Sequence, residues 1–143
     1  MGGTLVLDSE GLSKLAAGDA RAHAYLDSAR ARRARVATSA ITLTQTLRGG
    51  PRDARVHRVL SRIAVVPVSA QIARHAGELL GATGLSGHQC AIDAVVAATA
   101  VVAATALGLE RPIVLLTSDP DDMNRLAEEP GRPKAERIVV VHV

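Results

Sequence analysis

The sequence predicts an α/β fold built around a mainly parallel β-sheet. Three observations predict it: short runs of Val, Ile and Leu without polar alternation, helix-period segments in the gaps between those runs, and a length of 143 residues that suits one domain. Apolar runs without alternation indicate strands that are covered on both faces. Strands that alternate with helices indicate right-handed crossover connections. We therefore expect helices on both sides of a central sheet.

Four apolar runs are the predicted strands, and a fifth, weaker run lies between the first two. In chain order the runs are Thr4–Leu7, the weaker Val36–Thr38, Ala64–Val68, Ile113–Leu116 and Ile138–Val143. Helical segments fill the gaps, several of them with a glycine or a capping residue at one end. The expected helices are Ser9–Ala17, Ala20–Arg35, a helix capped by Ser39 that runs to Arg48, Asp53–Ile63, Ser69–Thr83, a long helix from about Gln89 to Leu107, and Pro120–Glu129.

The predicted helix Asp53–Ile63 carries two separate stripes. Its apolar stripe consists of Val56, Val59, Leu60 and Ile63. Its basic stripe consists of Arg55, Arg58 and Arg62. We expect the apolar stripe to face the core and the basic stripe to face solvent.

Composition narrows the class of protein. Hydrophobic residues make up 48% of the chain, yet it has no Trp or Phe and only one tyrosine, Tyr25. The single cysteine, Cys90, excludes a disulfide scaffold, and we expect it to be a small buried residue. The longest apolar run, Ala94–Leu107, has 14 residues, whereas a membrane span needs about 20. We therefore expect a cytoplasmic protein that has no membrane segment.

The charges are unevenly distributed along the chain. The net charge is +3, but the segment from Arg21 to Arg62 holds ten arginines and two acids, which gives +8, and the rest of the chain gives −5. A basic region beside an acidic remainder is typical of a protein that binds nucleic acid and cuts it at a carboxylate–metal site. An ordinary solvated surface explains the same counts equally well, so charge alone leaves both interpretations open.

Three aspartates are the candidate catalytic residues. Asp8 follows the first predicted strand, Asp119 follows the fourth, and Asp93 opens the long apolar helix. Ligands bind beyond the carboxyl ends of the strands in open α/β sheets. Singly, each aspartate is explained as a helix cap or a first-turn acid. Together they favour a site for a hard cation, Mg²⁺ or Mn²⁺, that activates water against a phosphodiester.

The order of several short motifs resembles the PIN domain, and in particular the small stand-alone toxins of the VapC type. The motifs are Leu5–Ser9, Thr44–Gly50, Ala76–Leu80, Asp93-Ala94 with Ala97-Ala98, and Val114–Asp122. The resemblance covers nearly the whole chain, which implies a single PIN-like domain over residues 1–143. It implies a three-layer fold whose central sheet has the strand order 3-2-1-4-5.

The resemblance also implies a function and a set of site residues. It implies a Mg²⁺-dependent (or Mn²⁺-dependent) endoribonuclease, the toxin of a toxin–antitoxin pair, that cleaves RNA, is commonly a homodimer and is neutralised by an antitoxin protein. Asp8, Asp93 and Asp119 match the acidic metal-binding positions of the family. Ser9 and Thr117 match small hydroxyl positions beside them.

One position departs from the family pattern. Gln45 stands where the family has a glutamate, and an amide brings neither a negative charge nor a general base. Asp121 or Asp122 is a candidate to compensate, and otherwise the chain is a catalytically weakened module that binds RNA or a partner. Arg48 and its neighbours Arg52 and Arg55 are candidates for RNA binding, although ordinary surface charge explains them equally well.

A third class of function is less favoured. An aspartyl-phosphate receiver also places aspartates at strand ends, but the receiver family needs a lysine beyond the last strands. The run Ile138–Val143 contains no lysine.

Overall fold

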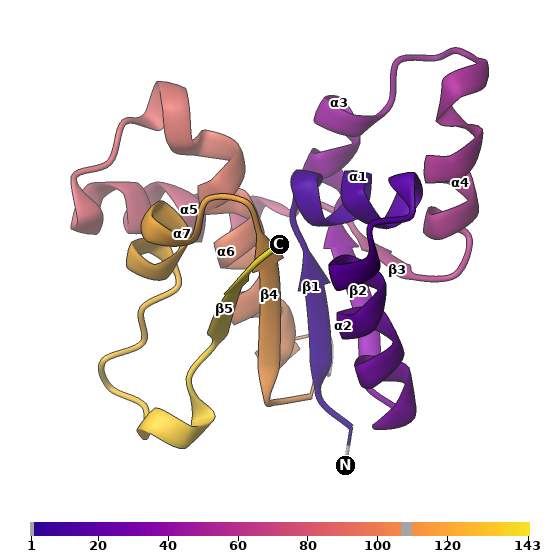
Figure 1. Cartoon of the computed structure of the whole chain (residues 1–143). Coiled ribbons are helices and arrows are strands. Elements are labelled where there is room, and N and C mark those ends of the chain that lie inside the picture. Colours follow the sequence, from indigo (N-terminus) through magenta and orange to yellow (C-terminus); the bar gives the residue numbers. More distant parts are fainter. Residues whose placement is uncertain (1, 107–109) are drawn as a thin grey trace.

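The computed structural model describes residues 2–106 and 110–143. In this part of the chain, five strands form one sheet with the order β3-β2-β1-β4-β5, and every pair of neighbouring strands is parallel. The strands are β1 (Thr4–Leu7), β2 (Arg35–Ser39), β3 (Ala64–Val66), β4 (Ile113–Thr117) and β5 (Val139–His142). The predicted fold class and strand order are therefore confirmed (Figure 1).

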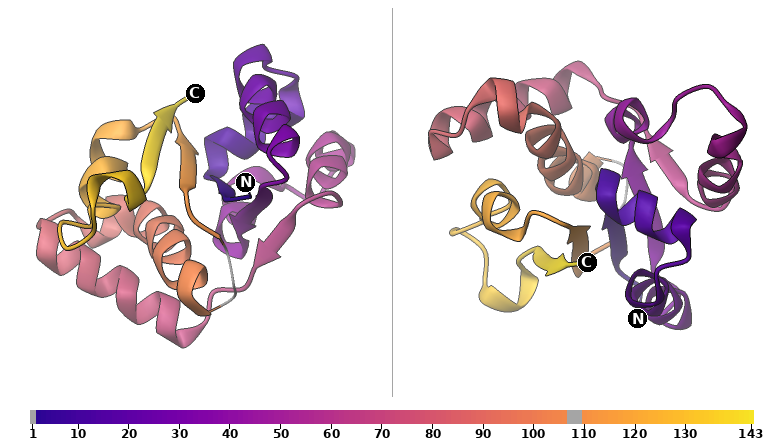
Figure 2. Two further views of the ribbon diagram at one scale, coloured as in Figure 1. Left: turned by 90° about the horizontal axis from the view of Figure 1, so that it is seen from below. Right: turned by 45° about the horizontal axis from the view of Figure 1, so that its top comes forward.

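Helices cover both faces of the sheet (Figures 1 and 2). The α-helices are α1 (Ser9–Ala17), α2 (Ala20–Ala31), α3 (Leu43–Thr46), α4 (Ala54–Leu60), α5 (Ala70–Thr83), α6 (Gly87–Ala106) and α7 (Pro120–Leu126). Short 3₁₀ turns are η1 (Ala40–Thr42), η2 (Pro51–Asp53) and η3 (Lys134–Glu136). Helices α1, α2 and α4 lie on one face, and α5, α6 and α7 lie on the other. No helix among the residues described is long and apolar enough to cross a membrane.

The sheet separates two hydrophobic cores. Successive side chains of a strand point to opposite faces, so Val6 of β1 packs with α5, α6 and α7, whereas Leu5 and Leu7 pack with α1, α2 and α4. Both cores consist of aliphatic side chains and alanine. This agrees with a sequence that has no Trp or Phe.

The edge strands are less buried than predicted. Val65 on β3 is 38% exposed and Val139 on β5 is 50% exposed. The apolar runs at 64–68 and 138–143 are predicted to be covered on both faces, and this is wrong for Val65 and Val139. Both residues lie on the outermost strands of the sheet. β3 is also shorter than predicted and ends before Pro67, which has no N–H to donate to the sheet.

Several helix boundaries also differ from the prediction. The predicted helix Ala20–Arg35 ends at Ala31, because the chain turns through a left-handed residue, Arg33 (φ 57°), to enter β2. The helix expected after Ser39 is divided into η1 and the short α3, which ends at Thr46. The predicted helices Asp53–Ile63 and Pro120–Glu129 are each shorter in the structure, as α4 and α7.

The start of the long helix affects the candidate site. Helix α6 begins at Gly87, two residues before the predicted start. Asp93 therefore lies in the second turn and does not open the helix, which corrects the prediction. The predicted end at Leu107 lies outside the described residues.

Candidate active site

The sheet topology brings Asp8 and Asp119 to the same end of the sheet, where the strands have their carboxyl ends. β1 and β4 are parallel neighbours in which Leu7 pairs with Leu116. Asp8 follows directly after β1, and its N–H donates to the carbonyl of Leu116 at 3.1 Å. Asp119 follows two residues after β4. The two aspartates therefore meet where these strands end, as the sequence predicts.

Asp8 is held firmly at the start of α1. Its Oδ1 atom accepts a hydrogen bond from the N–H of Gly11 at 2.8 Å, which makes Asp8 the N-cap of that helix. Thr117 donates a second hydrogen bond to the carboxylate. Burial raises the pKa of Asp8 above its ordinary value although both hydrogen bonds act in the opposite direction. A buried carboxylate of this kind favours a nearby positive charge.

Asp93 is a partly buried carboxylate whose negative charge no hydrogen bond from the described residues stabilises. Burial, followed by the negative charges of Asp8, Asp119 and Asp122, raises its pKa to about 6. No group in the described part of the chain donates a hydrogen bond to its side chain. The structure thus brings the three predicted acidic residues into one cluster, with Asp122 as a fourth member. We call these four residues the acidic cluster.

Thr117 links two members of the acidic cluster. Its Oγ1 atom accepts a hydrogen bond from the N–H of Asp119 at 3.0 Å, and its hydroxyl hydrogen-bonds to Asp8. Asp119 is also the N-cap of α7, because its Oδ1 atom accepts from the N–H of Asp122 at 3.4 Å. The hydroxyl of Thr117 therefore fixes the end of β4 relative to the end of β1.

Sequence reasoning missed the position of Cys90. The thiol is buried, as predicted, but its Sγ atom lies 3.8 Å from Oδ2 of Asp122 and donates a weak hydrogen bond there. Burial, followed by the charges of Asp122 and Asp93, raises the pKa of the thiol, so it stays protonated. The available signal was its spacing of three residues from Asp93, which places both on one side of α6.

Gln45 contacts the site through Ser9. The Oε1 atom of Gln45 on α3 accepts a hydrogen bond from the hydroxyl of Ser9, the residue after Asp8. The side chain of Gln45 is exposed. The structure thus places this neutral amide at the rim of the acidic cluster, where it orients a hydroxyl and adds no charge.

The three candidate RNA-binding arginines come from different elements: Arg48 from the loop after α3, Arg52 from η2 and Arg55 from α4. Arg48 and Arg52 flank the loop after α3, where the carboxylate of Asp53 accepts hydrogen bonds from the N–H groups of Arg48 and Gly49 at 3.0 and 2.7 Å. The Arg48 guanidinium turns back to the carbonyl of Leu47. Arg55 is on α4 and lines a hollow beside α1 and α2.

The donor set of the acidic cluster suits a hard divalent cation. Carboxylate oxygens are the preferred ligands of Mg²⁺ and Mn²⁺, and a cation would offset the mutual repulsion that raises the pKa of Asp93. Within residues 2–106 and 110–143, no three His, Cys, Asp or Glu side chains are close enough to hold one ion between them. The cluster therefore has the chemistry for metal binding, and its side chains would have to close around the ion.

Comparison with known proteins identifies a family and a set of similar folds. A model of the PIN domain family matches residues 5–129. A search of curated proteins finds no match. The chain is similar in structure to VapBC2 from Rickettsia felis bound to a DNA fragment from its promoter, with a TM-score of 0.69 and 16% sequence identity over 98% of both chains.

Two further solved structures show the same fold. One is a toxin–antitoxin complex from Klebsiella pneumoniae, with a TM-score of 0.62 and 23% identity over 94% of this chain and 99% of that chain. The other is FitAcB from Neisseria gonorrhoeae, with a TM-score of 0.59 and 20% identity over 95% of both chains. At these identities the likeness is one of fold.

Proposed function

The chain belongs to the PIN domain family, whose model matches residues 5–129, and from this premise we propose that it is a metal-dependent endoribonuclease of the toxin type. One observation carries the proposal: Asp8 and Asp119 follow the neighbouring strands β1 and β4, and both carboxylates lie close enough to Asp93 for their charges to act on it. A partly buried carboxylate whose pKa is raised by burial and by neighbouring charges, as that of Asp93 is, is typical of functional sites.

Asp8, Asp93 and Asp119 would hold the ion, which we propose to be Mg²⁺ or Mn²⁺. When bound, such an ion supplies an activated water and stabilises negative charge on a phosphodiester under attack. The chain's own residues prepare the site for it. Thr117 and the N–H of Gly11 hold Asp8 in one orientation, and the thiol of Cys90 donates a weak hydrogen bond to Asp122.

A protein partner is part of the proposal. Among the solved structures with this fold are a toxin–antitoxin complex and VapBC assemblies. We propose by analogy that an antitoxin protein binds this chain and inhibits it. The homodimer implied by the resemblance stays a prediction, and an analytical ultracentrifugation run on the purified chain tests it.

The first experiment measures cleavage of a structured RNA in the presence of Mg²⁺ or Mn²⁺. We expect the wild-type chain to cleave and Asp8→Ala to lose activity by orders of magnitude, because the ion provides most of the charge stabilisation in the transition state. Asp27→Ala on α2 is the matched control, since it removes one exposed aspartate far from the acidic cluster in sequence. Equal activity of wild type and Asp8→Ala contradicts the proposal.

A second candidate function rests on Gln45. A neutral amide at the rim of the acidic cluster favours a module that binds RNA or a partner and cleaves weakly. The substitution Gln45→Glu separates the two functions. A large gain in activity identifies the native chain as weakened, whereas an unchanged rate shows that the three aspartates suffice.

A further inference from the structure

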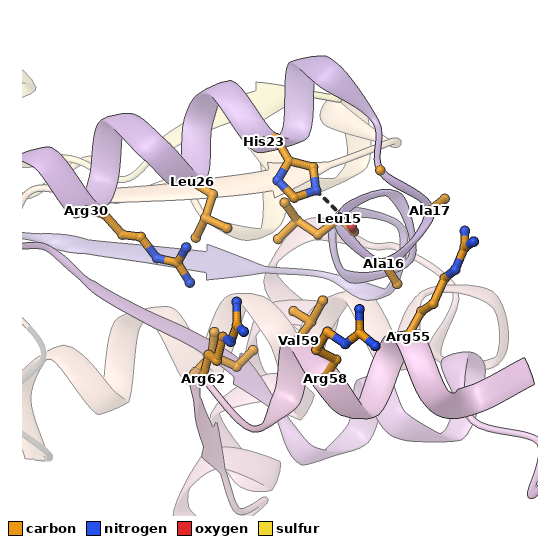
Figure 3. A pocket seen from close by; sticks show the side chains of 12 residues that line it. Leu15, Ala16, Ala17, His23, Leu26, Arg30, Arg55, Arg58, Val59 and Arg62 are labelled. Atoms are coloured by element: carbon orange, nitrogen blue, oxygen red, sulfur yellow. Dashed lines mark hydrogen bonds between the residues drawn. The ribbon is translucent and has the colours of Figure 1, made fainter. Parts of the chain in front are cut away.

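A cationic hollow lies between α1, α2 and α4, on the face of the sheet that these helices cover. Its volume is about 370 Å³. Arg55 and Arg58 of α4, together with Arg62 just after that helix, line one side of it, and Arg30 of α2 lines the other. Figure 3 shows the guanidinium groups of Arg30 and Arg62 directed toward each other across the opening. We call this site the arginine hollow.

The positive charge of the arginine hollow has no counterpart in the described part of the chain. No carboxylate there lies within salt-bridge distance of any of the four arginines. Guanidinium groups that face one another repel, and an anion between them would relieve the repulsion and form charge-assisted hydrogen bonds with them. All four cations are arginine, whose planar group forms paired hydrogen bonds to phosphate oxygens. This arrangement suits a ligand with more than one phosphate.

The walls between the arginines are apolar. Leu15 and Leu26 face Val59 and Ile63 across the hollow. His23 also lies there, but its Nε2 atom already bonds to the carbonyl of Leu15 at 3.0 Å. An aliphatic lining of this kind accepts an uncharged, flat group beside the phosphates. A nucleotide has both parts, a charged phosphate and a base with apolar faces.

We propose that the arginine hollow binds nucleotides of the RNA strand that lie outside the cleavage site. This inference rests on the proposed function and adds a second contact surface for the same substrate. Helix α1 begins directly after Asp8, and its last turn lines the hollow. A helix of nine residues spans about 13 Å. A stacked strand advances about 3.4 Å per nucleotide, so about four nucleotides separate the two surfaces.

Binding of a labelled single-stranded RNA of about 12 nucleotides tests the proposal, without any need for cleavage. The measurement is the dissociation constant from fluorescence anisotropy over a series of salt concentrations, in EDTA. Arg30→Gln with Arg62→Gln removes the facing pair. Arg32→Gln with Arg74→Gln is the matched control, because it removes the same charge from two exposed arginines outside the hollow.

We call the double substitution Arg30→Gln with Arg62→Gln the hollow variant and expect it to bind the RNA about tenfold more weakly than wild type. The slope of the logarithm of the binding constant against the logarithm of the salt concentration should become shallower by about 1.4, since each phosphate contact in a single strand contributes about 0.7. The control should keep the wild-type slope. Equal changes in the hollow variant and the control would show general charge attraction and overturn the proposal.

A protein segment is the competing ligand. A synthetic amphipathic helical peptide with a glutamate-rich polar face is the probe for it. Tighter binding of this peptide than of RNA, lost in the hollow variant and kept in the control, would assign the hollow to a protein partner and overturn the RNA assignment. Failure of Asp8→Ala to reduce cleavage would contradict the proposed activity and leave these binding results unchanged, so the two failures are distinct.

Discussion

At the scale of single residues, the acidic cluster combines structural and chemical tasks. Asp8 and Asp119 are N-caps of α1 and α7, so their side chains bond to backbone N–H groups. Asp93 has no such partner in the described residues, and its pKa is raised to about 6. Ionisation of Asp93 therefore lowers the free energy of unfolding, and the size of this loss depends on pH.

Asp93→Asn should raise stability at neutral pH. The pKa of Asp93 is raised from 3.8 to about 6 on folding, so the folded chain binds this proton more tightly than the unfolded chain. Stability falls as the pH rises from about 4 to about 6 and stays lower above that range. We expect Asp93→Asn to unfold at higher urea concentration than wild type at pH 7.5 in EDTA, by about 1–3 kcal/mol, and to match wild type at pH 4. A difference independent of pH contradicts this account.

Thr117→Val should weaken both the fold and the site. Thr117 is fully buried and links Asp119 to Asp8, so the substitution leaves a buried carboxylate with one partner fewer. We expect a loss of about 1–3 kcal/mol in urea unfolding and a lower cleavage rate. Thr117→Ser keeps the hydroxyl and should retain most of the activity. If valine and serine behave alike, the hydroxyl has no role.

At the scale of the elements, the segment between α7 and β5 depends on one carboxylate. Glu129 forms two hydrogen bonds with the Arg111 guanidinium at 2.7 and 3.0 Å, and it accepts a further bond from Nε of Arg132 at 2.9 Å. Its Oε1 atom also accepts from the N–H of Ile138, just before β5. Glu129 therefore connects the start of β4, the loop after α7 and the start of β5.

Glu129→Gln should destabilise this segment. The amide cannot pair with two guanidinium groups, and both Arg111 and Glu129 have mostly buried side chains. We expect a loss of about 3 kcal/mol in the free energy of unfolding. Glu128→Gln is the control, because Glu128 is the exposed neighbour and its change should alter stability by less than about 0.5 kcal/mol. Equal effects of the two substitutions would exclude a special role for Glu129.

At the scale of the whole molecule, the sheet organises two regions of opposite charge. The acidic cluster lies at the carboxyl ends of β1 and β4, and the arginine hollow lies over the face covered by α1, α2 and α4. In the acidic region, neighbouring carboxylates repel the ionised side chain of Asp93 in the folded chain. A ligand that binds only the folded chain and neutralises that region must stabilise the whole fold.

Mn²⁺ should therefore raise the melting temperature of the chain. At a concentration 100 times the dissociation constant, binding to one site adds about 2.7 kcal/mol, which for a chain of this size raises the melting temperature by several degrees. The measurement is a thermal melt in EDTA and in increasing Mn²⁺. Asp8→Ala with Asp93→Asn should show no such rise. An equal rise in the double variant would place the ion elsewhere.

The sequence by itself predicts much of the local structure. The ranges of β1 and α1 agree with the structure, because an unbroken apolar run, a capping aspartate and Gly18 act on their immediate neighbours. The candidate acids are also visible in the sequence, since a carboxylate beside an apolar strand or helix is unfavourable without a partner. The strand order and the gathering of the acids follow from the resemblance to the PIN domain.

The tertiary structure decides what depends on neighbours far apart in the chain. It determines which strands lie at the edges and are exposed, that Cys90 bonds to Asp122, and that Arg55 joins Arg30 in a hollow rather than Arg48 at the site. The physical reason is that burial, ion pairing and like-charge repulsion depend on distances in space, and helical periodicity fixes such distances only within one element.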